Sequence, residues 1–503
     1  MELFIIAAFA AWLGSVGMGT NLGYSSPAIP SLQKANATDA LTINDDEKSW
    51  FGSLLTIGAL IGGLLAGFPT DIFGRKKSLI LSGIGLSCGW VVIATAKSVV
   101  MLCSGRVIAG FFTGLISLVV PVYVSETSRP DVRGSLGAGI QLSVTIGILA
   151  VYIFGIFLSW SSLALVATAP TCLMAVMMLF MVESPRWLLI QGRREDALNA
   201  LKFLYSQSQD HEAECRAIED NIKMNPVEKF KMKELLQPFI YKPILISVFL
   251  MVSQQLSGIN AVMFYALSIF ADAGTDIRPE ICMVIIGVVQ VVATLVATMV
   301  MDKGGRRVML LISVVLLGIS LAVLGGYHYM KKTKGDAAVN DMSWLPLLCL
   351  SVFIIGFSCG MGPVPWLMMG ELLPARVKGI ASSICTGVNW GMAFVVTKEF
   401  DRMLSLFGAH GTYWFFGVVM ALSFIVIFAA VPETKGKTLE EIEMQFRGIT
   451  YEPLKPESPP PGPGDHPQLL EHPAAAGALP VAAGPGVVAL NVQQPVLGVP
   501  LQH

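Results

Sequence analysis

The segment Asp71-Ile-Phe-Gly-Arg-Lys76 is repeated 231 residues later as Asp302-Lys-Gly-Gly-Arg-Arg307. Each copy directly follows a long apolar stretch, so an acidic residue, a glycine and two basic residues occupy corresponding places in two parts of the chain. Recurrence of a whole pattern at corresponding positions predicts an internal duplication. The chain is therefore expected to consist of two similar halves.

Two further patterns recur in the same order. One is a glutamate just after the sixth apolar stretch of each half, and the other is a glutamate seven residues ahead of a basic residue that precedes a glycine. They are Val182-Glu-Ser-Pro-Arg186 with Pro432-Glu-Thr-Lys-Gly-Lys437, and Glu126…Arg133-Gly134 with Glu371…Lys378-Gly379. Internal repeats of this kind are the usual construction of secondary transporters.

The paired charges at these helix ends predict an ion-pair network. A preference of basic residues for the cytoplasmic side explains the Arg and Lys residues, but it does not explain the matching Asp and Glu residues. Such pairs can hold the two halves together while the path faces outward. An exposed pair contributes only about 0–1 kcal/mol, but several pairs can bias a two-state equilibrium. The residues are Asp71, Arg75, Glu126, Arg133, Glu183, Arg186, Asp302, Arg306, Arg307, Glu371, Lys378 and Glu433.

The composition places the chain in a membrane. Of 503 residues, 54% are hydrophobic and only 14% are charged, which is outside the range of soluble proteins. One crossing needs roughly 20 largely apolar residues. Continuous apolar stretches predict helices and exclude a β-barrel, whose strands alternate in polarity. Twelve such stretches lie near 3–28, 50–70, 78–96, 99–124, 135–158, 162–182, 243–271, 280–301, 308–327, 344–369, 378–404 and 411–431.

The expected fold is therefore an all-α polytopic membrane protein with twelve transmembrane helices in two six-helix halves. Residues 1–182 and 243–447 are the halves, 183–242 is a helical cytoplasmic linker, and 448–503 is a tail that is rich in Pro, Gly and Ala and is expected to be disordered. The first stretch is too long and lacks a basic flank for a cleaved signal peptide. It is expected to be helix 1.

Neither the cysteines nor the net charge indicates a metal, a cofactor or a nucleic-acid partner. Seven of the eight cysteines lie within the predicted crossings, so neither a disulfide framework nor a metal-ligand pattern is present, and no cofactor is expected. The net charge of -1 gives no indication of a nucleic-acid partner. The lipid bilayer is the expected partner.

Basic residues in the loops favour cytoplasmic termini. Ten Lys and Arg residues lie in the short loops after even-numbered stretches and ten more lie in 183–242, against nine in the remaining loops. This excess predicts that both termini are cytoplasmic, although the three lysines between 331 and 334 do not fit the count. The sequon at Asn36 would then lie outside the cytosol, where glycosylation occurs.

Three amide side chains in the seventh stretch are candidates for binding a neutral polyol. Gln254 and Gln255 lie five or six residues before Asn260, so all three can line one cavity if the helix breaks at Gly258. An amide can both donate to and accept from a sugar hydroxyl without adding charge. The alternative is that these amides only join packed helices. On the residues alone, both interpretations stand equally.

The duplicated Asp-x-x-Gly-Arg pattern, together with Pro432-Glu-Thr-Lys-Gly436, resembles the sugar porter branch of the major facilitator superfamily up to about residue 447. Within that branch, Gln254-Gln-Leu-Ser-Gly-Ile-Asn260 and Gly362-Pro-Val-Pro-Trp366 resemble facilitative glucose transporters. Gly23-Tyr-Ser-Ser-Pro-Ala-Ile-Pro30 and Thr397-Lys-Glu-Phe400 resemble the third class of that family. The resemblance implies the major facilitator fold and transport of a hexose by alternating access, with glucose as the first candidate.

The same resemblance implies which residues form the sugar path. Tyr265 is expected to form the outer gate, and Pro363 and Pro365 are expected to interrupt helix 10 where it must bend, although prolines also occur in static membrane helices. The residues that the resemblance places around the sugar are Gln141, Gln254, Gln255, Asn260, Gln290, Trp366, Asn389 and Trp390.

Several positions depart from the glucose carriers that the chain resembles. Gln290 stands where those carriers often have Asn, Ser358 lies in the stretch where they have a Glu, and Met251 stands where several have Gln. The preferred hexose therefore stays open, and a disaccharide such as trehalose is an alternative substrate. Lys378 replaces the usual Arg, which removes bidentate geometry and is expected to weaken one bridge.

The resemblance also bears on energy coupling. Proton-coupled relatives have an Asp directly after the Gly-Tyr pair of helix 1, beside an Arg of helix 4. Here Ser25 takes the place of that Asp, while Arg106 remains. The expected mechanism is passive uniport, and the alternatives are a proton-coupled symporter and a sugar sensor that does not transport.

A sorting signal is expected in the tail. Asp465-His-Pro-Gln-Leu469-Leu470 matches the pattern acidic-x-x-x-Leu-Leu, which clathrin adaptors read on endosomal and lysosomal cargo. Such a short match also arises by chance in a disordered segment. The expected locations are the cell membrane, endosomal and lysosomal membranes, or both.

Overall fold

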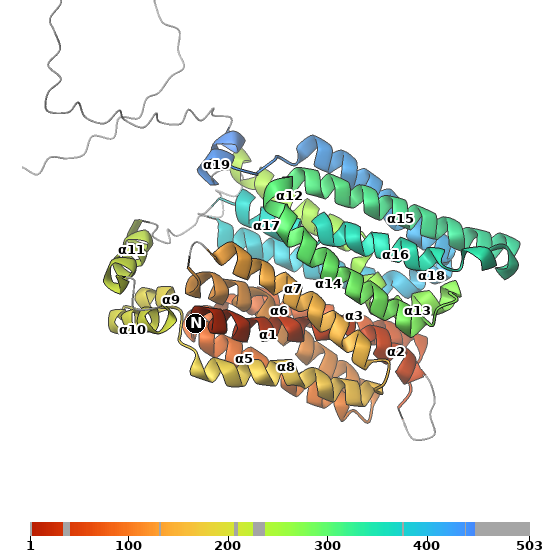
Figure 1. Ribbon diagram of the computed structural model, residues 1–503, viewed down its shortest axis with the longest axis horizontal. Helices are drawn as coiled ribbons and strands as arrows, with labels where there is room; N and C mark the ends of the chain where they lie inside the picture. The colour runs from red at the N-terminus through yellow and green to blue at the C-terminus, as the bar shows by residue number, and fades with distance from the viewer. Residues whose placement is uncertain are drawn as a thin grey trace, which may run out of the picture. The chain divides into compact units, whose positions relative to one another are not determined.

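The computed structural model describes residues 3–33, 41–129, 132–205, 210–224, 237–374, 377–437 and 439–447, all within one compact unit, Met1–Tyr451. Regular structure in these residues is helical throughout, and the long helices lie side by side (Figure 1). The predicted all-α fold is confirmed. Asn36, Asp465, Leu469 and Leu470 lie outside the described residues, as does the side chain of Asp302.

The first half contains six crossings, the first two of which are each built from two helices. A turn at Tyr24 separates α1 from α2, and Ala66 separates α3 from α4. The helices are α1 (Leu3–Gly23), α2 (Ser25–Gln33), α3 (Asp45–Leu65), α4 (Gly67–Ile72), α5 (Arg75–Ala94), α6 (Val99–Thr127), α7 (Arg133–Phe154) and α8 (Trp160–Phe180).

The segment between the halves is helical where it is described, as predicted. It forms α9 (Pro185–Ile190), α10 (Arg194–Leu204) and α11 (His211–Met224). The predicted apolar face of α10 is buried, with Ala197, Leu201 and Leu204 at most 1% exposed. Trp187 Nε1 donates to the backbone carbonyl of Asp71 at 2.9 Å, which attaches α9 to the end of α4.

The second half repeats the arrangement with more interruptions. Its helices are α12 (Pro238–Gln255), α13 (Ile259–Ala273), α14 (Pro279–Gly304), α15 (Arg306–Lys334), α16 (Leu345–Gly356), α17 (Val364–Leu372), α18 (Lys378–Ala430) and α19 (Leu439–Arg447). Two short 3-10 turns, Asp336–Ala338 and Asn340–Met342, connect α15 to α16. A π-helical segment, Phe357–Met361, follows α16 and leads into Pro363 and Pro365, so helix 10 is interrupted as predicted.

The count of crossings depends on how α18 is divided. Eleven described helical segments are long and apolar enough to cross a membrane, and α18 is the last of them. With 53 residues, α18 would be about 80 Å long if straight, which far exceeds a bilayer core of about 30 Å. Gly408 within it has φ +71° and ψ 169°, a backbone break between two crossings. The eleventh and twelfth predicted crossings are therefore both contained in α18.

Local sequence explains how helices start and pack. Asn44 caps α3 because its side chain accepts from the Glu47 N–H at 2.9 Å, and the Glu47 carboxylate accepts in return from the Asn44 N–H at 2.9 Å. Small residues then bring helices together. A Cβ added to Gly62 of α3 would lie only 1.9 Å from the Phe111 carbonyl oxygen of α6.

Successive long helices run in opposite directions, so the bundle has two ends. We call the end that carries the duplicated patterns the motif end, and the other the opposite end. Helices α9, α10, α11 and α19 lie at the motif end (Figure 1). The halves meet where α3 packs on α18, α7 on α14 and α2 on α13. The motif end comprises 71–76, 126–129, 132–133, 183–186, 302–307, 371–374, 377–378 and 433–437, and the opposite end comprises 41–48, 95–98, 155–159, 273–278, 335–344 and 401–410.

Candidate functional site

The seventh crossing is broken at the place where the sequence puts its amides. α12 ends at Gln255 and α13 begins at Ile259. Gly258 between them has φ +85° and ψ 9°, a left-handed conformation that glycine adopts without steric penalty. The break thus lies where the three amides need it in order to line one cavity. Gln254 and Gln255 therefore form the last turn of α12, while Asn260 lies in the first turn of α13.

Four amide side chains at this break form one hydrogen-bonded chain, which we call the amide cluster. Asn260 Nδ2 donates to Gln255 Oε1 at 2.6 Å, and Gln255 Nε2 donates to Asn389 Oδ1 at 3.1 Å. Asn389 Nδ2 donates in turn to Gln254 Oε1 at 2.8 Å. The last three residues are at most 5% exposed. The cluster joins α12, α13 and α18.

The amide cluster ends on the interrupted tenth crossing. Gln254 Nε2 donates to the carbonyl oxygens of Met361 at 2.7 Å and Gly362 at 2.8 Å. In a regular helix the N–H of residue 365 would reach the Met361 carbonyl, but Pro365 has no N–H. The glutamine amide satisfies a carbonyl that the proline leaves without a helical partner. The polar chain and the bend of the tenth crossing are thus coupled.

The other residues expected around the sugar are not hydrogen-bonded to the amide cluster in the described part of the chain. Gln290 on α14 and Trp390 on α18 are each 4% exposed, yet Gln290 Oε1 and Trp390 Nε1 have no described hydrogen-bond partner. Trp390 belongs to a buried group with Ala59 of α3, so it lies where the halves meet. Gln141 on α7 and Trp366 on α17 are half-buried.

Polar contacts join the two halves at the opposite end. Lys48 Nζ on α3 lies 2.8 Å from Asp401 Oδ1 on α18. Ser49 Oγ donates to the Lys398 carbonyl at 2.9 Å and accepts from Lys398 Nζ at 3.1 Å. The Lys398 ammonium also lies 4.3 Å from the ring centroid of Trp50. These contacts close the space between the halves at this end.

Tyr265, the expected gate, lies within this closed region. Its φ of −116° and ψ of 16° are not helical, so α13 is kinked there. Its ring stacks on Phe400 with centroids 5.2 Å apart, and Lys48 Nζ lies 5.3 Å from its centroid. A cavity of about 40 Å³ adjoins these side chains and is also lined by Asp272 and His328.

One of the lysines that did not fit the loop count has a structural partner here. Lys331 Nζ donates to the carbonyl oxygens of Asp272 and Ala273, at 2.8 and 3.1 Å. Both carbonyls lie at the C-terminal end of α13, where a positive charge is favourable. Lys331 therefore stabilises the end of the kinked helix.

At the motif end of the first half, the duplicated patterns come together. Arg75 Nε and Nη2 donate to the two oxygens of Glu126 at 2.9 and 3.1 Å, and Ser184 Oγ donates to Glu126 Oε2 at 2.6 Å. Glu183 Oε1 accepts from the backbone N–H groups of Arg75 and Lys76 at 2.8 and 3.0 Å. One glutamate thus binds the arginine side chain, and the other caps the helix that begins at that arginine.

The second half repeats this arrangement residue for residue. Arg306 Nη2 donates to Glu371 Oε1 at 3.1 Å, and Thr434 Oγ1 donates to Glu371 Oε2 at 2.6 Å. Glu433 accepts from the backbone N–H groups of Arg306 at 2.8 Å and Arg307 at 3.1 Å. The three sequence patterns of each half therefore meet in one cluster, which accounts for their joint recurrence.

The glycine of the duplicated pattern has a specific conformation in both copies. Gly74 and Gly305 directly precede α5 and α15 with φ of +90° and +81°. A Cβ at Gly74 would lie 2.3 Å from Glu183 Oε2, and a Cβ at Gly305 would lie 2.9 Å from Glu433 Oε2. A side chain at either place would displace the glutamate that caps the following helix.

The pairing differs from the sequence expectation in one respect. Arg75 with Glu126, and Arg306 with Glu371, are pairs within one half, whereas the sequence predicted bridges between the halves. The contacts described above join the halves at the opposite end instead. Bridges between the halves at the motif end therefore remain a prediction for an arrangement in which the opposite end is open.

Other members of the predicted network contribute less. Asp71 is 78% exposed on its side chain and lies 3.8 Å from Arg75 Nη1. Lys378 Nζ donates to the Gly370 carbonyl at 2.6 Å. Arg133 and Arg186 are exposed at the motif end.

Arg106 is fully buried in the first half, and none of the described ion pairs includes it. Its Nη2 donates to Ser25 Oγ at 2.6 Å, its Nη1 to Asn21 Oδ1 at 2.9 Å and its Nε to the Phe51 carbonyl at 3.2 Å. The Phe51 ring centroid is 5.0 Å from the guanidinium carbon. Neutral oxygens and an aromatic face thus surround the charge.

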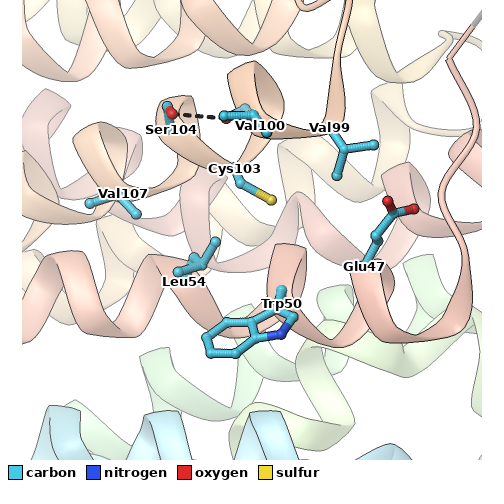
Figure 2. A pocket seen from close by; sticks show the side chains of 8 residues that line it. All are labelled: Glu47, Trp50, Leu54, Val99, Val100, Cys103, Ser104 and Val107. Atoms are coloured by element: carbon cyan, nitrogen blue, oxygen red, sulfur yellow. Dashed lines mark hydrogen bonds between the residues drawn. The ribbon is translucent and has the colours of Figure 1, made fainter.

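A pocket of about 380 Å³ on the first half shares Trp50 with the contacts at the opposite end (Figure 2). Figure 2 shows Trp50 and Leu54 of α3 on one side and Val99, Cys103 and their neighbours from the α6 region on the other. Its remaining lining residues are Glu47, Val100, Ser104 and Val107. Because the second half contributes no lining residue, this pocket is not a passage between the halves.

Sequence reasoning missed the contacts that close the opposite end. Lys398 and Asp401 are charges within or beside the eleventh apolar stretch, and such charges are candidates for function by default. That signal could have identified them. Their partners, Lys48 and Ser49, lie about 350 residues earlier in the chain, so no local spacing identifies the pairs.

Comparison with known proteins identifies close relatives. The profile of the family described as Sugar (and other) transporter matches residues 7–446. Facilitated glucose transporter member 8 of solute carrier family 2, from Mus musculus, is 41% identical over 458 residues, covering 88% of this chain and 94% of that protein. Facilitated trehalose transporter Tret1 of Drosophila virilis is 40% identical over 446 residues, covering 88% of this chain; the chain spans about half, 49%, of that relative.

Solved structures share the fold. The proton:xylose symporter XylE, in a structure bound to 6-bromo-6-deoxy-D-glucose, superposes with a TM-score of 0.73 at 24% identity, covering 88% of this chain and 99% of XylE. An inward-open structure of the xylose transporter XylE from E. coli gives a TM-score of 0.72 at the same identity and coverage. The predicted fold of twelve helices in two six-helix halves is confirmed.

Proposed function

The chain belongs to the sugar transporter family of the major facilitator superfamily, and we propose that it carries a hexose, first of all glucose, between its two halves by alternating access. The observation that carries the choice of substrate is the amide cluster of Gln254, Gln255, Asn260 and Asn389. Its groups are neutral and able both to donate and to accept, and all of them except the half-buried Asn260 are buried. An uncharged polyol is the ligand that such groups suit.

Two unpaired groups support the same assignment. Buried polar atoms are normally hydrogen-bonded, so the lone acceptor Gln290 Oε1 and the lone donor Trp390 Nε1 are exceptions that a polar ligand can satisfy. A sugar hydroxyl can donate to the first and accept from the second. Trp366 and Trp390 also supply apolar faces for the C–H side of a sugar ring. Gln141 completes the proposed set from the first half.

Trehalose is the second candidate substrate. The relatives named facilitated trehalose transporters match this chain at 39–40% identity, close to the 41% of the relative named for glucose. Competition for uptake of labelled glucose into proteoliposomes distinguishes the candidates. We expect unlabelled glucose to compete. The degree to which fructose and galactose lower the uptake of labelled glucose gives the order of preference among hexoses. Competition by trehalose alone would contradict a hexose path, and absence of flux would favour a sugar sensor.

We propose passive uniport, and the surroundings of Arg106 support it. A proton-coupled site needs a group that gains and loses a proton beside the moving substrate, whereas Arg106 contacts Ser25, Asn21 and a backbone carbonyl. We predict that alkalinising the source side leaves the initial rate of glucose uptake unchanged. The measurement is uptake into vesicles at matched sugar gradients. Abolition of uptake on the alkaline side would contradict uniport.

The proposed orientation places the motif end and both termini in the cytoplasm, because basic residues are in excess there. The proposed destination includes endosomal and lysosomal membranes. A clathrin adaptor would direct the protein there by recognising the signal that contains Asp465, Leu469 and Leu470. We predict that replacing Leu469 and Leu470 by Ala moves the protein to the cell surface. Surface biotinylation of both forms measures this, and an unchanged distribution would eliminate the signal.

A further inference from the structure

The kink in α13 exposes one backbone donor and one backbone acceptor to the first half. In a regular α-helix the N–H of residue 267 pairs with the carbonyl of residue 263. Here the Leu267 N–H donates to Ser26 Oγ at 3.0 Å, and the Met263 carbonyl accepts from the Tyr152 hydroxyl at 2.8 Å. Tyr265, the residue with non-helical dihedral angles, lies midway between them.

Both partners are buried side chains of the first half. Ser26 on α2 is 1% exposed and Tyr152 on α7 is 0% exposed. The Ser26 hydroxyl donates to Met283 Sδ on α14 at 3.2 Å, so its proton is engaged and its lone pairs face the Leu267 N–H. Each hydroxyl is therefore oriented toward the second half. Two helices of the first half thus bond to the N–H and the carbonyl that a regular helix would pair with each other.

We propose that Ser26 and Tyr152 act as a latch, which keeps α13 kinked while the opposite end is closed. When the halves separate there, the two side chains withdraw and α13 forms the bond between Leu267 and Met263. This inference rests on the alternating access of the proposed function and adds the positioning residues that stabilise one of its two states. Neither residue belongs to the set proposed to touch the sugar.

The exchange of partners explains how the helix can change shape inside a membrane. Backbone groups at membrane depth must be satisfied within the protein, because lipid offers no hydrogen bonds. In the closed arrangement the two hydroxyls satisfy the Leu267 N–H and the Met263 carbonyl. In the open arrangement these groups satisfy one another. Because neither state leaves them unpaired, the two can remain close in free energy, as a reversible cycle requires.

The latch is separate from the ion pair at the same end. The Tyr265 ring faces Phe400 and Lys48, beside α18 and α3, whereas the latch bonds reach α2 and α7. Loss of the latch leaves the ion pair between Lys48 and Asp401 in place. The two devices can therefore be tested independently.

The test compares Ser26→Ala and Tyr152→Phe, each of which removes one latch bond. The backbone group left without its partner penalises only the kinked state, so we expect each variant to shift the ratio of open to closed molecules about fivefold toward open. The readout is the distance distribution between spin labels at Lys97→Cys and Ala337→Cys. Both positions are exposed at the opposite end, one in each half. The exposed native cysteines, Cys88 and Cys172, are replaced by Ser in this background so that they are not labelled.

Matched controls remove hydroxyls that bond within the first half. Tyr24→Phe deletes a donor to the Trp160 carbonyl at 2.7 Å, and Ser82→Ala deletes a donor to the Ser78 carbonyl at 2.7 Å. We expect wild-type distributions for both. Thermal unfolding of all variants is recorded in parallel, because a purely structural role would lower the unfolding temperature without changing the distance distribution.

The outcomes separate the latch from the transport cycle. Wild-type distributions in both latch variants, in a protein that otherwise populates two distances, would overturn the latch and leave alternating access intact. A wild-type protein that shows one distance with and without glucose, on either side of the membrane, would overturn alternating access, and the latch with it. A shift in either latch variant and in neither control supports the proposal.

Discussion

Replacing Asn389 by Leu will lower kcat/KM for glucose uptake about thirtyfold. Leucine has a similar size, but it cannot donate to Gln254 Oε1 or accept from Gln255 Nε2. Two buried hydrogen bonds at about 1 kcal/mol each correspond to this factor. Both glutamine amides also lose their orientation toward a sugar. The measurement is initial uptake of labelled glucose into proteoliposomes as a function of sugar concentration.

A second polar link between the same two helices provides the control. Ser253 of α12 and Ser423 of α18 are hydrogen-bonded to each other but are separate from the amide cluster. Ser253→Ala therefore removes helix-joining polarity without touching the proposed sugar groups, and its kcat/KM should stay near that of the wild type. If Asn389→Leu also transported normally, the amides would serve only to join helices, the alternative that the sequence left open.

Replacing Glu433 by Ala will lower the free energy of unfolding by about 2 kcal/mol. Its carboxylate accepts from the backbone N–H groups of Arg306, Arg307, Thr434 and Lys435, at 2.8 to 3.1 Å. The first two belong to the first turn of α15, which has no other side-chain cap. The measurement is unfolding of the purified protein in detergent, followed by helical circular dichroism.

Asp71→Ala is the matched control for this prediction. Asp71 is also a carboxylate of the duplicated pattern, but it is largely exposed and its Oδ1 lies 3.8 Å from Arg75 Nη1. An exposed pair of this kind contributes about 0–1 kcal/mol, so its loss should change stability little. Equal destabilisation by the two substitutions would show that the loss of a negative charge, rather than the loss of the helix cap, lowers the free energy of unfolding.

The contribution of Glu433 should also depend on pH in a defined direction. Burial raises the pKa of its carboxyl group, but the backbone N–H groups of Lys435, Arg306, Arg307 and Thr434 lower it more, so the net pKa lies below the ordinary value. A carboxyl group with a lowered pKa stabilises the fold above its unfolded pKa, about 4.3. The difference in stability between wild type and Glu433→Gln should shrink as the pH falls below that value. A constant difference in acid would contradict this account of the cap.

The sequence predicted the parts of the fold that local pattern determines. Twelve apolar stretches and the interruption at Pro363 and Pro365 correspond to features of the helices. The break at Gly258 meets the condition under which the three amides could line one cavity. The duplicated patterns were predicted to interact, and they meet in one cluster per half because each pattern ends a helix at the same end of the bundle. The chemistry of the amide residues was also visible in sequence, since buried amides need partners.

What the sequence did not reveal depends on which residues meet across the two halves. The pair of Lys48 and Asp401, and the latch of Ser26 and Tyr152 on α13, join residues far apart in the chain. Ser26 is one of several serines in apolar helices, and nothing in its local spacing marks it. The sequence also did not reveal that the described pairs at the motif end, Arg75 with Glu126 and Arg306 with Glu371, each lie within one half.

The central claim is that glucose moves passively between the halves, and one measurement addresses it directly. The purified protein is placed in liposomes that contain a pH-sensitive dye, and labelled glucose is added outside. The account predicts that glucose enters until the two concentrations are equal, while the internal pH stays constant and a proton ionophore leaves the rate unchanged. Accumulation above the external concentration, a pH change coupled to uptake, or no flux beyond that of empty liposomes would contradict it.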